Sequence, residues 1–535
     1  MLEFLKNRRV QSGFLAAVSI IAVLVFFAEI AVLVLYRETW ADEVFSSFKS
    51  YLLLKGSFTP FVESNFEYSP LVIFTFGLVQ YFFGPNLYAG RILSVVFLIL
   101  ATGIFSYLLK RRAGSWGMVA GWGLLLSNIL LMGNYITTTM YALSFLLLMV
   151  LILIQEKVVR IVPQVVLSSV VISLLILARI NMIAAFIAYL AYLLISKVKI
   201  RYAFFSVAIV AVVIVLAYIP IVRANPDLAI ATILSPFGNF GPLKELPTSL
   251  KVGGQTIFRF IEILSLFVRE YFGYLLIGFL SVVAVSYAHM KEKKFGLLLA
   301  DRAYFLAVTL AVVLLGTHYF YWRIVSNVYY ANYFIPVIIL VAVLSIAKMT
   351  SQRALLWGVV VTVIGLNVLM NIFRTDVISD PRAESDISRV ERGAEAVRKN
   401  TKPEDTILTF DNSIYHVYLA DRRTYFPLMN RDFLFLNSTD TPMVRSIGFY
   451  NTEMVKEWLT NDADYLLLHA ERWPSSFIRS RFWGTAEGGL MNDIKVLDQT
   501  IKNDYELVDT VYNVYPRKYT EGNDGGTLLI YRRIK

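Results

Sequence analysis

Long apolar runs recur through the first 374 residues of this chain, and most are close to the roughly 20 residues that a helix needs to cross a bilayer. The first run lacks a small-residue cleavage site, so we interpret it as a retained helix and not as a signal peptide. We predict eleven membrane-spanning helices, at about residues 13–36, 86–109, 115–133, 136–154, 161–178, 180–196, 202–222, 270–288, 303–322, 329–347 and 353–373. The sequence therefore predicts a polytopic α-helical membrane protein.

The loops between these runs predict the orientation of the chain, because Lys and Arg concentrate on the cytoplasmic side of membrane proteins. With the N-terminus inside, every inside loop is basic or holds a basic cluster; these loops lie at residues 110–112, 156–160, 197–201, 291–302 and 348–353. The run Pro70–Phe83 is only 14 residues long, and counting it as a span would invert each later loop. We therefore predict that it is a helix lying at the membrane interface.

Charge divides the chain into two predicted domains. Residues 1–374 hold 29 Lys and Arg against 14 Asp and Glu, a balance of +15, and residues 375–535 hold 21 against 25, a balance of −4. The first part is predicted to be a transmembrane domain in the plasma (inner) membrane, and residues 375–535 an extracytoplasmic α/β domain. The basic excess lies between apolar runs and not on one solvated face, which argues against a nucleic-acid partner.

The predicted C-terminal domain shows few signs of chemistry. We expect a helix at Glu384–Lys399 and strands at 406–410, 464–469, 505–515 and 527–532. No glycine-rich phosphate loop follows a strand, and His416 and His469 are isolated in the sequence, so we expect each to be structural. Cysteine is absent, which excludes disulfides, thiolate zinc sites and cysteine nucleophiles.

Acidic residues of the membrane part gather in the first outside loop, at residues 37–85. Five of its 14 acids lie there: Glu38, Asp42, Glu43, Glu63 and Glu67. Asp42 and Glu43 begin an amphipathic segment that ends at Gly56, which predicts a second interfacial helix in this loop. One interpretation is that Asp42 only caps this helix. The other is that carboxylates at an apolar boundary are functional, because they are costly there unless used or paired.

Four segments around these acids resemble the beginning of GT-C-fold membrane glycosyltransferases. They read Trp40-Ala-Asp-Glu-Val, Leu53-Leu-Lys-Gly56, Phe66-Glu-Tyr-Ser-Pro-Leu71 and Phe83-Gly-Pro-Asn-Leu-Tyr-Ala-Gly-Arg91. The similarity covers residues 10–115 and is greatest to the aminoarabinose transferase and protein O-mannosyltransferase branch. The segment Glu391–Tyr425, which includes Tyr418-Leu-Ala-Asp-Arg422, also looks like C-terminal domains of such proteins.

The resemblance implies an inverting transferase that moves a sugar from a polyprenyl-phosphate carrier to an acceptor hydroxyl on the outer face of the membrane. It implies that Asp42 is the general base. Glu43 or Glu67 would position the acceptor or hold a divalent metal ion, and no nucleotide is required. The acceptor stays open between lipid A, a cell-wall glycan, a glycolipid and a protein.

The sequence departs from the family pattern at the phosphate. Tyr68 stands where related enzymes often carry a lysine, and Asn332-Tyr333 stands where they often show Arg-Tyr. The leaving phosphate still needs positive charge. We therefore predict that arginines at outer helix ends supply it, above all Arg91, Arg179 and Arg323.

Two other functions are compatible with this architecture. A lipid or polysaccharide transporter would carry charges along a path through the membrane, and few charges lie inside the apolar runs. A ligase or polymerase of lipid-linked oligosaccharides would share the architecture, with a larger outside loop and an Arg or His base. The acids of the first loop favour the transferase.

Overall fold

The computed structural model describes most of the chain. The described residues are 8–37, 43, 48, 50–52, 54–55, 70–196, 198–224, 226, 257–292, 300–320, 332–349, 353–372, 384–409, 413–425, 440–446, 450–471, 487–516 and 526–534. Their contacts divide the chain into two compact units. We call residues 1–34, 91–215 and 256–378 the helical unit, and residues 35–90, 216–255 and 379–535 the mixed unit. The predicted domain boundary at 374/375 lies outside the described residues.

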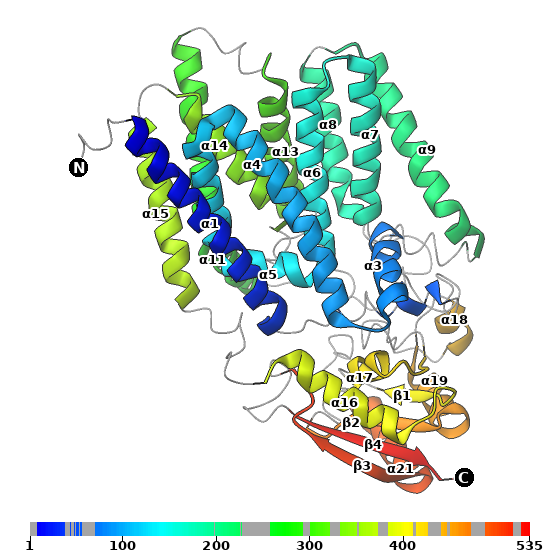
Figure 1. Ribbon diagram of the computed structural model, residues 1–535. Coiled ribbons are helices and arrows are strands. Elements are labelled where there is room, and N and C mark those ends of the chain that lie inside the picture. Colours follow the sequence, from blue (N-terminus) through cyan, green and yellow to red (C-terminus); the bar gives the residue numbers. More distant parts are fainter. Residues whose placement is uncertain are drawn as a thin grey trace. The chain divides into compact units, whose positions relative to one another are not determined.

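A described helix overlaps every predicted span (Figure 1). They are α1 (Arg8–Tyr36), α4 (Leu87–Leu126), α5 (Ile129–Thr137), α6 (Thr139–Lys157), α7 (Ile161–Ala178), η2 (Ile180–Met182), α8 (Ile183–Ile195), α9 (Arg201–Ala224), α11 (Ile257–Lys291), α13 (Arg302–Phe320), α14 (Ile335–Ala347) and α15 (Arg353–Ile372). Within the helical unit, α13 packs against α8 and α14, and α11 packs against α14.

Helix α4 holds the predicted span 86–109 and the first part of the predicted span 115–133. Its hydrogen bonding continues past Gly114, but that residue has a φ of 73°, so the helix breaks there. Only glycine adopts this left-handed conformation without strain. The break falls where the sequence predicts a loop between two spans, after the basic residues 110–112.

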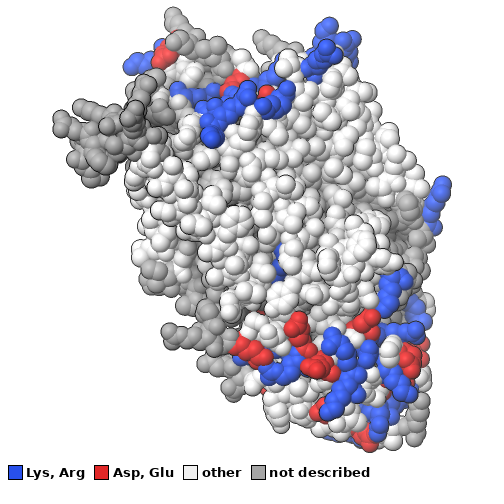
Figure 2. All heavy atoms as spheres, viewed as in Figure 1, with Lys and Arg blue, Asp and Glu red and all other residues white. Residues whose placement is uncertain are grey.

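The described helices are those of a multi-pass membrane protein. Six of them are long and apolar enough to cross a bilayer, and five more apolar helices, α3 among them, are shorter. Large apolar side chains are exposed along α1 and α9, such as Leu24 and Leu216, both 63% exposed. Exposed apolar surface of this extent is expected where a helix faces lipid. Figure 2 shows the uncharged belt that results.

Four of the predicted cytoplasmic loops meet in one network of ion pairs in the helical unit. Arg111 and Arg112 both pair with Glu156, and Arg112 also binds Asp301 over 2.7 Å. Lys348 contacts the same Asp301 oxygen over 2.5 Å. Burial alone would raise the pKa of Asp301, but the bonds with Lys348 and Arg112 lower it below its ordinary value. The network places these loops at one end of the helices, where Figure 2 shows Lys and Arg gathered.

A four-stranded sheet forms the centre of the mixed unit. Its order is β1-β2-β4-β3, from β1 (Ile407–Thr409), β2 (Tyr465–His469), β4 (Thr527–Arg533) and β3 (Tyr505–Tyr512). β1 runs parallel to β2, and the other two pairs are antiparallel. Leu467 is opposite Thr409 on one side and Ile530 on the other. The predicted strands thus join into the predicted α/β arrangement.

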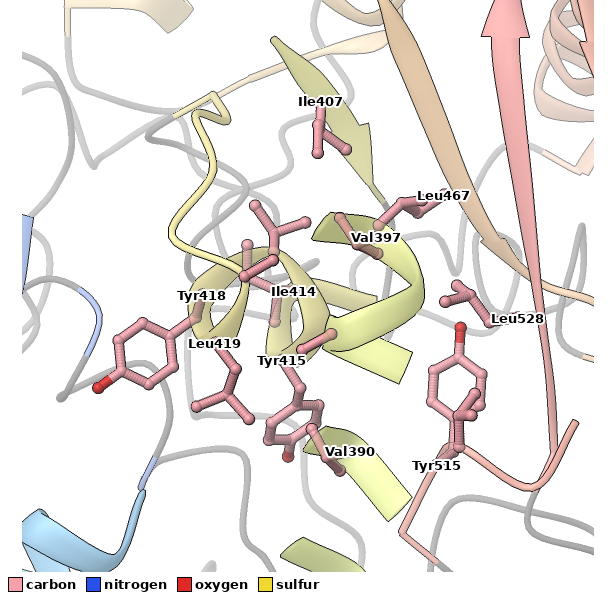
Figure 3. Packing of buried hydrophobic residues seen from close by; sticks show 14 of the residues in the cluster. Val390, Val397, Ile407, Ile414, Tyr415, Tyr418, Leu419, Leu467, Tyr515 and Leu528 are labelled. Carbon is pink, nitrogen blue, oxygen red and sulfur yellow. The ribbon is translucent and has the colours of Figure 1, made fainter. Parts of the chain in front are cut away.

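Helices complete the mixed unit. They are α16 (Asp386–Asn400), α17 (Ile414–Leu419), α18 (Thr441–Ser446), α19 (Thr452–Glu457), the π-helical turn η9 (Trp458–Asp462) and α21 (Glu487–Asp504). The Ser385 side chain caps α16 by accepting a hydrogen bond from the Ser388 amide. Val390 and Val397 of α16 belong to one buried cluster with Ile407, Leu467 and Leu528 of the sheet (Figure 3).

The predicted interfacial helix is α3 (Pro70–Phe83), with the predicted bounds. One face is buried through Val72, Ile73 and Phe76, whereas Phe82 and Phe83 are each 72% exposed. Described residues of the first outside loop cover it within the mixed unit. A Cβ added at Gly77 would lie 2.5 Å from the Ser50 carbonyl oxygen, so glycine allows the two backbones to approach.

Candidate functional site

Glu43 is the part of the predicted acidic site that the structure describes. It is helical and only 3% exposed. Its predicted partners Asp42 and Glu67 lie outside the described residues. Arg37, six residues earlier, is 2% exposed. Burying a charge is costly unless it is paired or used, so this short stretch carries two charges of the kind that mark functional sites.

The helical residues after Glu43 are fastened to α17 inside the mixed unit. The Phe48 ring lies 5.2 Å from the Tyr418 ring. Lys55 Nζ binds Asp421 at the end of α17 over 2.9 Å. Two described residues that follow Glu43 in the sequence, Phe48 and Lys55, are therefore anchored by one aromatic contact and one ion pair.

Arg179 lies at the centre of a polar cluster in the helical unit. It follows the last residue of α7, and its extended backbone (φ −160°, ψ 128°) ends the helix there. Its Nη1 donates to the Tyr333 hydroxyl over 2.7 Å and contacts the Met140 sulfur at 2.7 Å. The guanidinium also lies over the Tyr333 ring, 5.2 Å from its centre. A half-buried arginine beside a phenol is a strong donor set for an anion.

Buried tyrosines hold the residues next to this cluster in place. Asn332, with no exposed surface, accepts hydrogen bonds from Tyr135 on its backbone oxygen (2.7 Å) and from Tyr271 on its side chain (2.9 Å). The Tyr141 ring meets the Tyr333 ring edge-on at 4.6 Å. Asn332 and Tyr333 are thereby fixed at the beginning of α14. The sequence signal for Tyr333 is its place in Asn332-Tyr333-Phe334-Ile335-Pro336, where the sequence departs from the family pattern.

Arg91 has a different environment. It is fully buried, and its Nη1 donates to the Val34 carbonyl over 2.8 Å and to the Leu33 carbonyl at 3.5 Å. These carbonyls belong to the last turn of α1, where four backbone oxygens have no partner within the helix. Arg91 thus satisfies the end of a neighbouring helix, and its predicted role toward phosphate stays a prediction. Arg323 lies outside the described residues.

Histidines of the C-terminal part lie together, although they are distant in the sequence. The rings of His416 and His469 are 4.9 and 4.0 Å from the Tyr515 ring, and both side chains are fully buried. His416 Nδ1 bonds the Val390 carbonyl over 3.1 Å. Burial lowers the pKa of His416 to about 4. Both are integral to the core, as expected for structural histidines.

Glu43 and Glu67 are the predicted metal ligands. Among the described residues, no group of three or more His, Asp or Glu side chains could hold a metal ion. Of the predicted pair Glu43 and Glu67, only Glu43 is described.

Comparisons with known proteins place the fold. No family model and no curated protein matches the chain. Among solved structures, ArnT from Cupriavidus metallidurans bound to undecaprenyl phosphate matches 97% of this chain and 98% of its own, with a TM-score of 0.57 and 11% identity. The Archaeoglobus fulgidus oligosaccharyltransferase in complex with Zn and sulfate matches 95% of this chain and 72% of its own, with a TM-score of 0.52 and 11% identity.

A further structure of the archaeal oligosaccharyltransferase AglB from Archaeoglobus fulgidus contains an inhibitory peptide and a dolichol-phosphate. It matches 90% of this chain and 72% of its own at a TM-score of 0.50 and 11% identity. These proteins have the GT-C fold. The expected fold is confirmed over nearly the whole length of the chain: this protein has a GT-C-like membrane fold with a C-terminal α/β part.

Proposed function

We propose that this protein is an inverting glycosyltransferase that moves a sugar from a polyprenyl-phosphate carrier to an acceptor hydroxyl on the outer face of the membrane. The observation that supports it most is the end-to-end likeness to ArnT bound to undecaprenyl phosphate, which covers 97% of this chain and 98% of that one. A carrier whose tail dissolves in the membrane explains why a transferase needs a polytopic fold.

The phosphate of the carrier is the ligand that the Arg179 cluster fits. Phosphate oxygens accept charge-assisted hydrogen bonds from guanidinium groups, and these bonds strengthen as negative charge grows on the leaving group. The Tyr333 hydroxyl, held 2.7 Å from Arg179, is a second donor for the same anion. Arg91 and Arg323 remain additional proposed donors.

The acceptor is activated by Asp42 in this proposal. Its carboxylate takes the proton from the acceptor hydroxyl as that oxygen forms a bond to the anomeric carbon. The bond from this carbon to the phosphate oxygen breaks on the opposite side, and the phosphate leaves with the electron pair. The configuration at the anomeric carbon is therefore inverted. Glu43 and Glu67 position the acceptor hydroxyl.

A divalent metal ion is the second proposed role of Glu43 and Glu67. One matching oligosaccharyltransferase structure is a complex with Zn. Carboxylate oxygens suit hard divalent cations such as Mg²⁺ and Mn²⁺. Removal of metal by a chelator, followed by addition of single metals, measures the requirement, and unchanged transfer after removal contradicts it.

Asp42→Asn tests the proposed base. The purified variant, reconstituted with polyprenyl-phosphate-linked sugars and a panel of acceptors, is expected to lose roughly 10²–10⁴-fold in transfer rate, the usual contribution of a general base. Asparagine caps a helix about as well as aspartate, so folding should be unchanged. Glu38→Gln in the same loop is the matched control. Near-normal transfer by Asp42→Asn would leave Asp42 as a helix cap.

A second candidate function comes from the oligosaccharyltransferase matches. They favour a ligase that transfers a preassembled lipid-linked oligosaccharide. Mass spectrometry of the product separates the two candidates, because one transferred sugar and a transferred chain differ in mass. A finding of lipid movement without any transfer would instead indicate the transporter alternative.

A further inference from the structure

The turn that ends α17, at residues 418–422, has no part in the proposed chemistry, yet it holds two segments of the first outside loop. Tyr418 and Asp421 make these contacts, from residues more than 330 positions away in the sequence. All the residues involved belong to the mixed unit. The contacts are hydrogen bonds and an ion pair between specific side chains, so each of them can be removed by a single substitution.

Hydrogen bonds from Arg422 hold the turn to the end of α16. Arg422 donates from Nε to the Thr401 hydroxyl over 2.8 Å, and from its Nη atoms to the carbonyls of Thr401 and Ala420 over 3.0 Å each. Arg422 thereby ties the end of α17 to the end of α16. Asp421 has a φ of 53°, a left-handed conformation that Asp and Asn tolerate better than most residues.

The first contact receives the helical segment that follows Glu43. The Asp421 carboxylate accepts hydrogen bonds from Lys55 Nζ at 2.9 and 3.1 Å and from the Tyr51 hydroxyl at 3.2 Å. Burial lowers the pKa of Lys55, but the hydrogen bonds with Asp421 and Tyr51 and the charge of Asp421 together outweigh it, so the pKa is raised. Lys55 therefore stays charged when it binds.

The second contact receives the end of α3. The Tyr418 hydroxyl donates to Gln80 Oε1 over 2.7 Å, and the Asn86 amide lies 3.3 Å from the same hydroxyl. Gln80 also binds the Asn86 backbone at both its amide and its carbonyl, over 2.9 and 2.7 Å. In Figure 3 the Tyr418 ring points away from Leu528 and Tyr515, out of the core of the sheet.

We propose that the turn 418–422 is a positioning device for the acidic loop, with Tyr418 and Asp421 as positioning residues that fix the Glu43 segment and α3 for catalysis. The proposal rests on the proposed transfer function. It has a physical basis, because the two contacts fix the segments on both sides of Glu67, and ordering such a chain costs conformational entropy. A displacement of about 1 Å in a catalytic group can cost roughly 10²-fold in rate.

The contact between Lys55 and Asp421 is tested first by crosslinking, which needs no activity assay. The chain has no cysteine, so the double variant Lys55→Cys/Asp421→Cys offers two unique thiols to a short bifunctional thiol reagent. We expect efficient crosslinking within one molecule, read as a shift on gels and a linked peptide by mass spectrometry. The single-cysteine variants are the controls. Absence of the intramolecular crosslink would overturn the docking, whereas an efficient crosslink together with no transfer by the wild-type protein would overturn the proposed function alone.

Positioning is tested by kinetics of the full-length protein. Lys55→Met and Tyr418→Phe are expected to lower kcat about ten-fold, with the KM for the carrier unchanged, since neither touches the phosphate. Lys502→Met is the matched control, because it removes another exposed ion pair of the mixed unit, with Asp498 at 2.7 Å. In Lys55→Met/Asp421→Asn the losses should not add, because both changes remove one interaction. Wild-type kcat in Lys55→Met would refute the positioning role.

Discussion

An arginine at the end of a membrane helix can serve the helix or a ligand, and its hydrogen-bond partners distinguish the two. Arg91 donates to backbone carbonyls at the end of α1. Arg179 donates to a phenol and a thioether, which are weaker acceptors than the oxygens of a phosphate. Arg91 is therefore expected to contribute to stability in addition to its proposed role toward phosphate, whereas Arg179 is expected to contribute mainly to binding.

Arg179→Ala is expected to weaken binding of the polyprenyl phosphate by about 10- to 100-fold, because a hydrogen bond to a charged group contributes roughly 1.5–3 kcal/mol. Tyr333→Phe should cause a smaller loss. Binding is measured in nanodiscs with the carrier lipid. Arg91→Ala provides the comparison: we expect a lower Tm from it through the released α1 carbonyls. An unchanged affinity in Arg179→Ala would exclude it as the phosphate ligand.

His416 predicts how the stability of the mixed unit depends on pH. Its pKa falls from about 6.5 in an unfolded chain to about 4 because it is buried. The folded state thus binds fewer protons between these values, so stability is full above pH 6.5 and is lost as pH falls toward 4, by roughly 3 kcal/mol. Hydrogen exchange of α16 and α17 in the full-length protein measures this. His416→Gln should flatten the slope, and His289→Gln in α11 should not.

At the scale of elements, periodicity and length predicted most of the fold, because apolar runs fix helices with little help from distant contacts. α3 and α7 have the predicted bounds. The predicted span 115–133 instead became the end of α4 and the beginning of α5, since Asn128 caps a new helix by accepting from the Leu131 amide. The asparagine was visible in the sequence, but its capping role depends on a backbone conformation that an apolar run does not reveal.

Gly77→Ala is expected to disturb the contact of α3 with the first outside loop, because the added Cβ would lie 2.5 Å from the Ser50 carbonyl oxygen. Overpacking of this kind typically costs about 1–3 kcal/mol. Thermal unfolding and crosslinking of Lys55→Cys/Asp421→Cys in this background would report it. Gly316→Ala in α13 is the matched control, since its Cβ meets nothing within 4 Å. Equal Tm values for the two variants would show that α3 can shift at no cost.

At the scale of the whole molecule, loop charge predicted which loops lie together, and the network around Glu156 and Asp301 confirms that four of them share one end. The candidate site was less predictable. Acids clustered in one loop can be read from the sequence, but the hydrogen bond between Arg179 and Tyr333 joins residues 154 positions apart and depends on tertiary packing. The anchoring of Lys55 by Asp421 joins residues 366 positions apart, and no local pattern encodes such a pair.

The orientation of the chain is tested by thiol labelling in intact cells, again using the absence of cysteine. Lys110 lies in the basic stretch of α4 just before its break at Gly114, Lys402 lies in the mixed unit, and both side chains are exposed. We expect an impermeant reagent to label Lys402→Cys and to reach Lys110→Cys only after the cells are opened, because positive loops stay inside. Labelling in the opposite order would invert the predicted orientation.

The ion pairs of Glu156 and Asp301 also bear on motion. They link helices α4 and α6 to the beginning of α13 and the end of α14, so these helices are held together at one end. A bundle held like this spreads mainly at its free end, because separating the tied ends would strand buried charges without partners. A long lipid tail that enters sideways between helices would therefore find the helix ends beside Glu156 and Asp301 hard to separate and the opposite ends easier to separate. These two acids would in this way influence an opening at the far end of the helices from themselves.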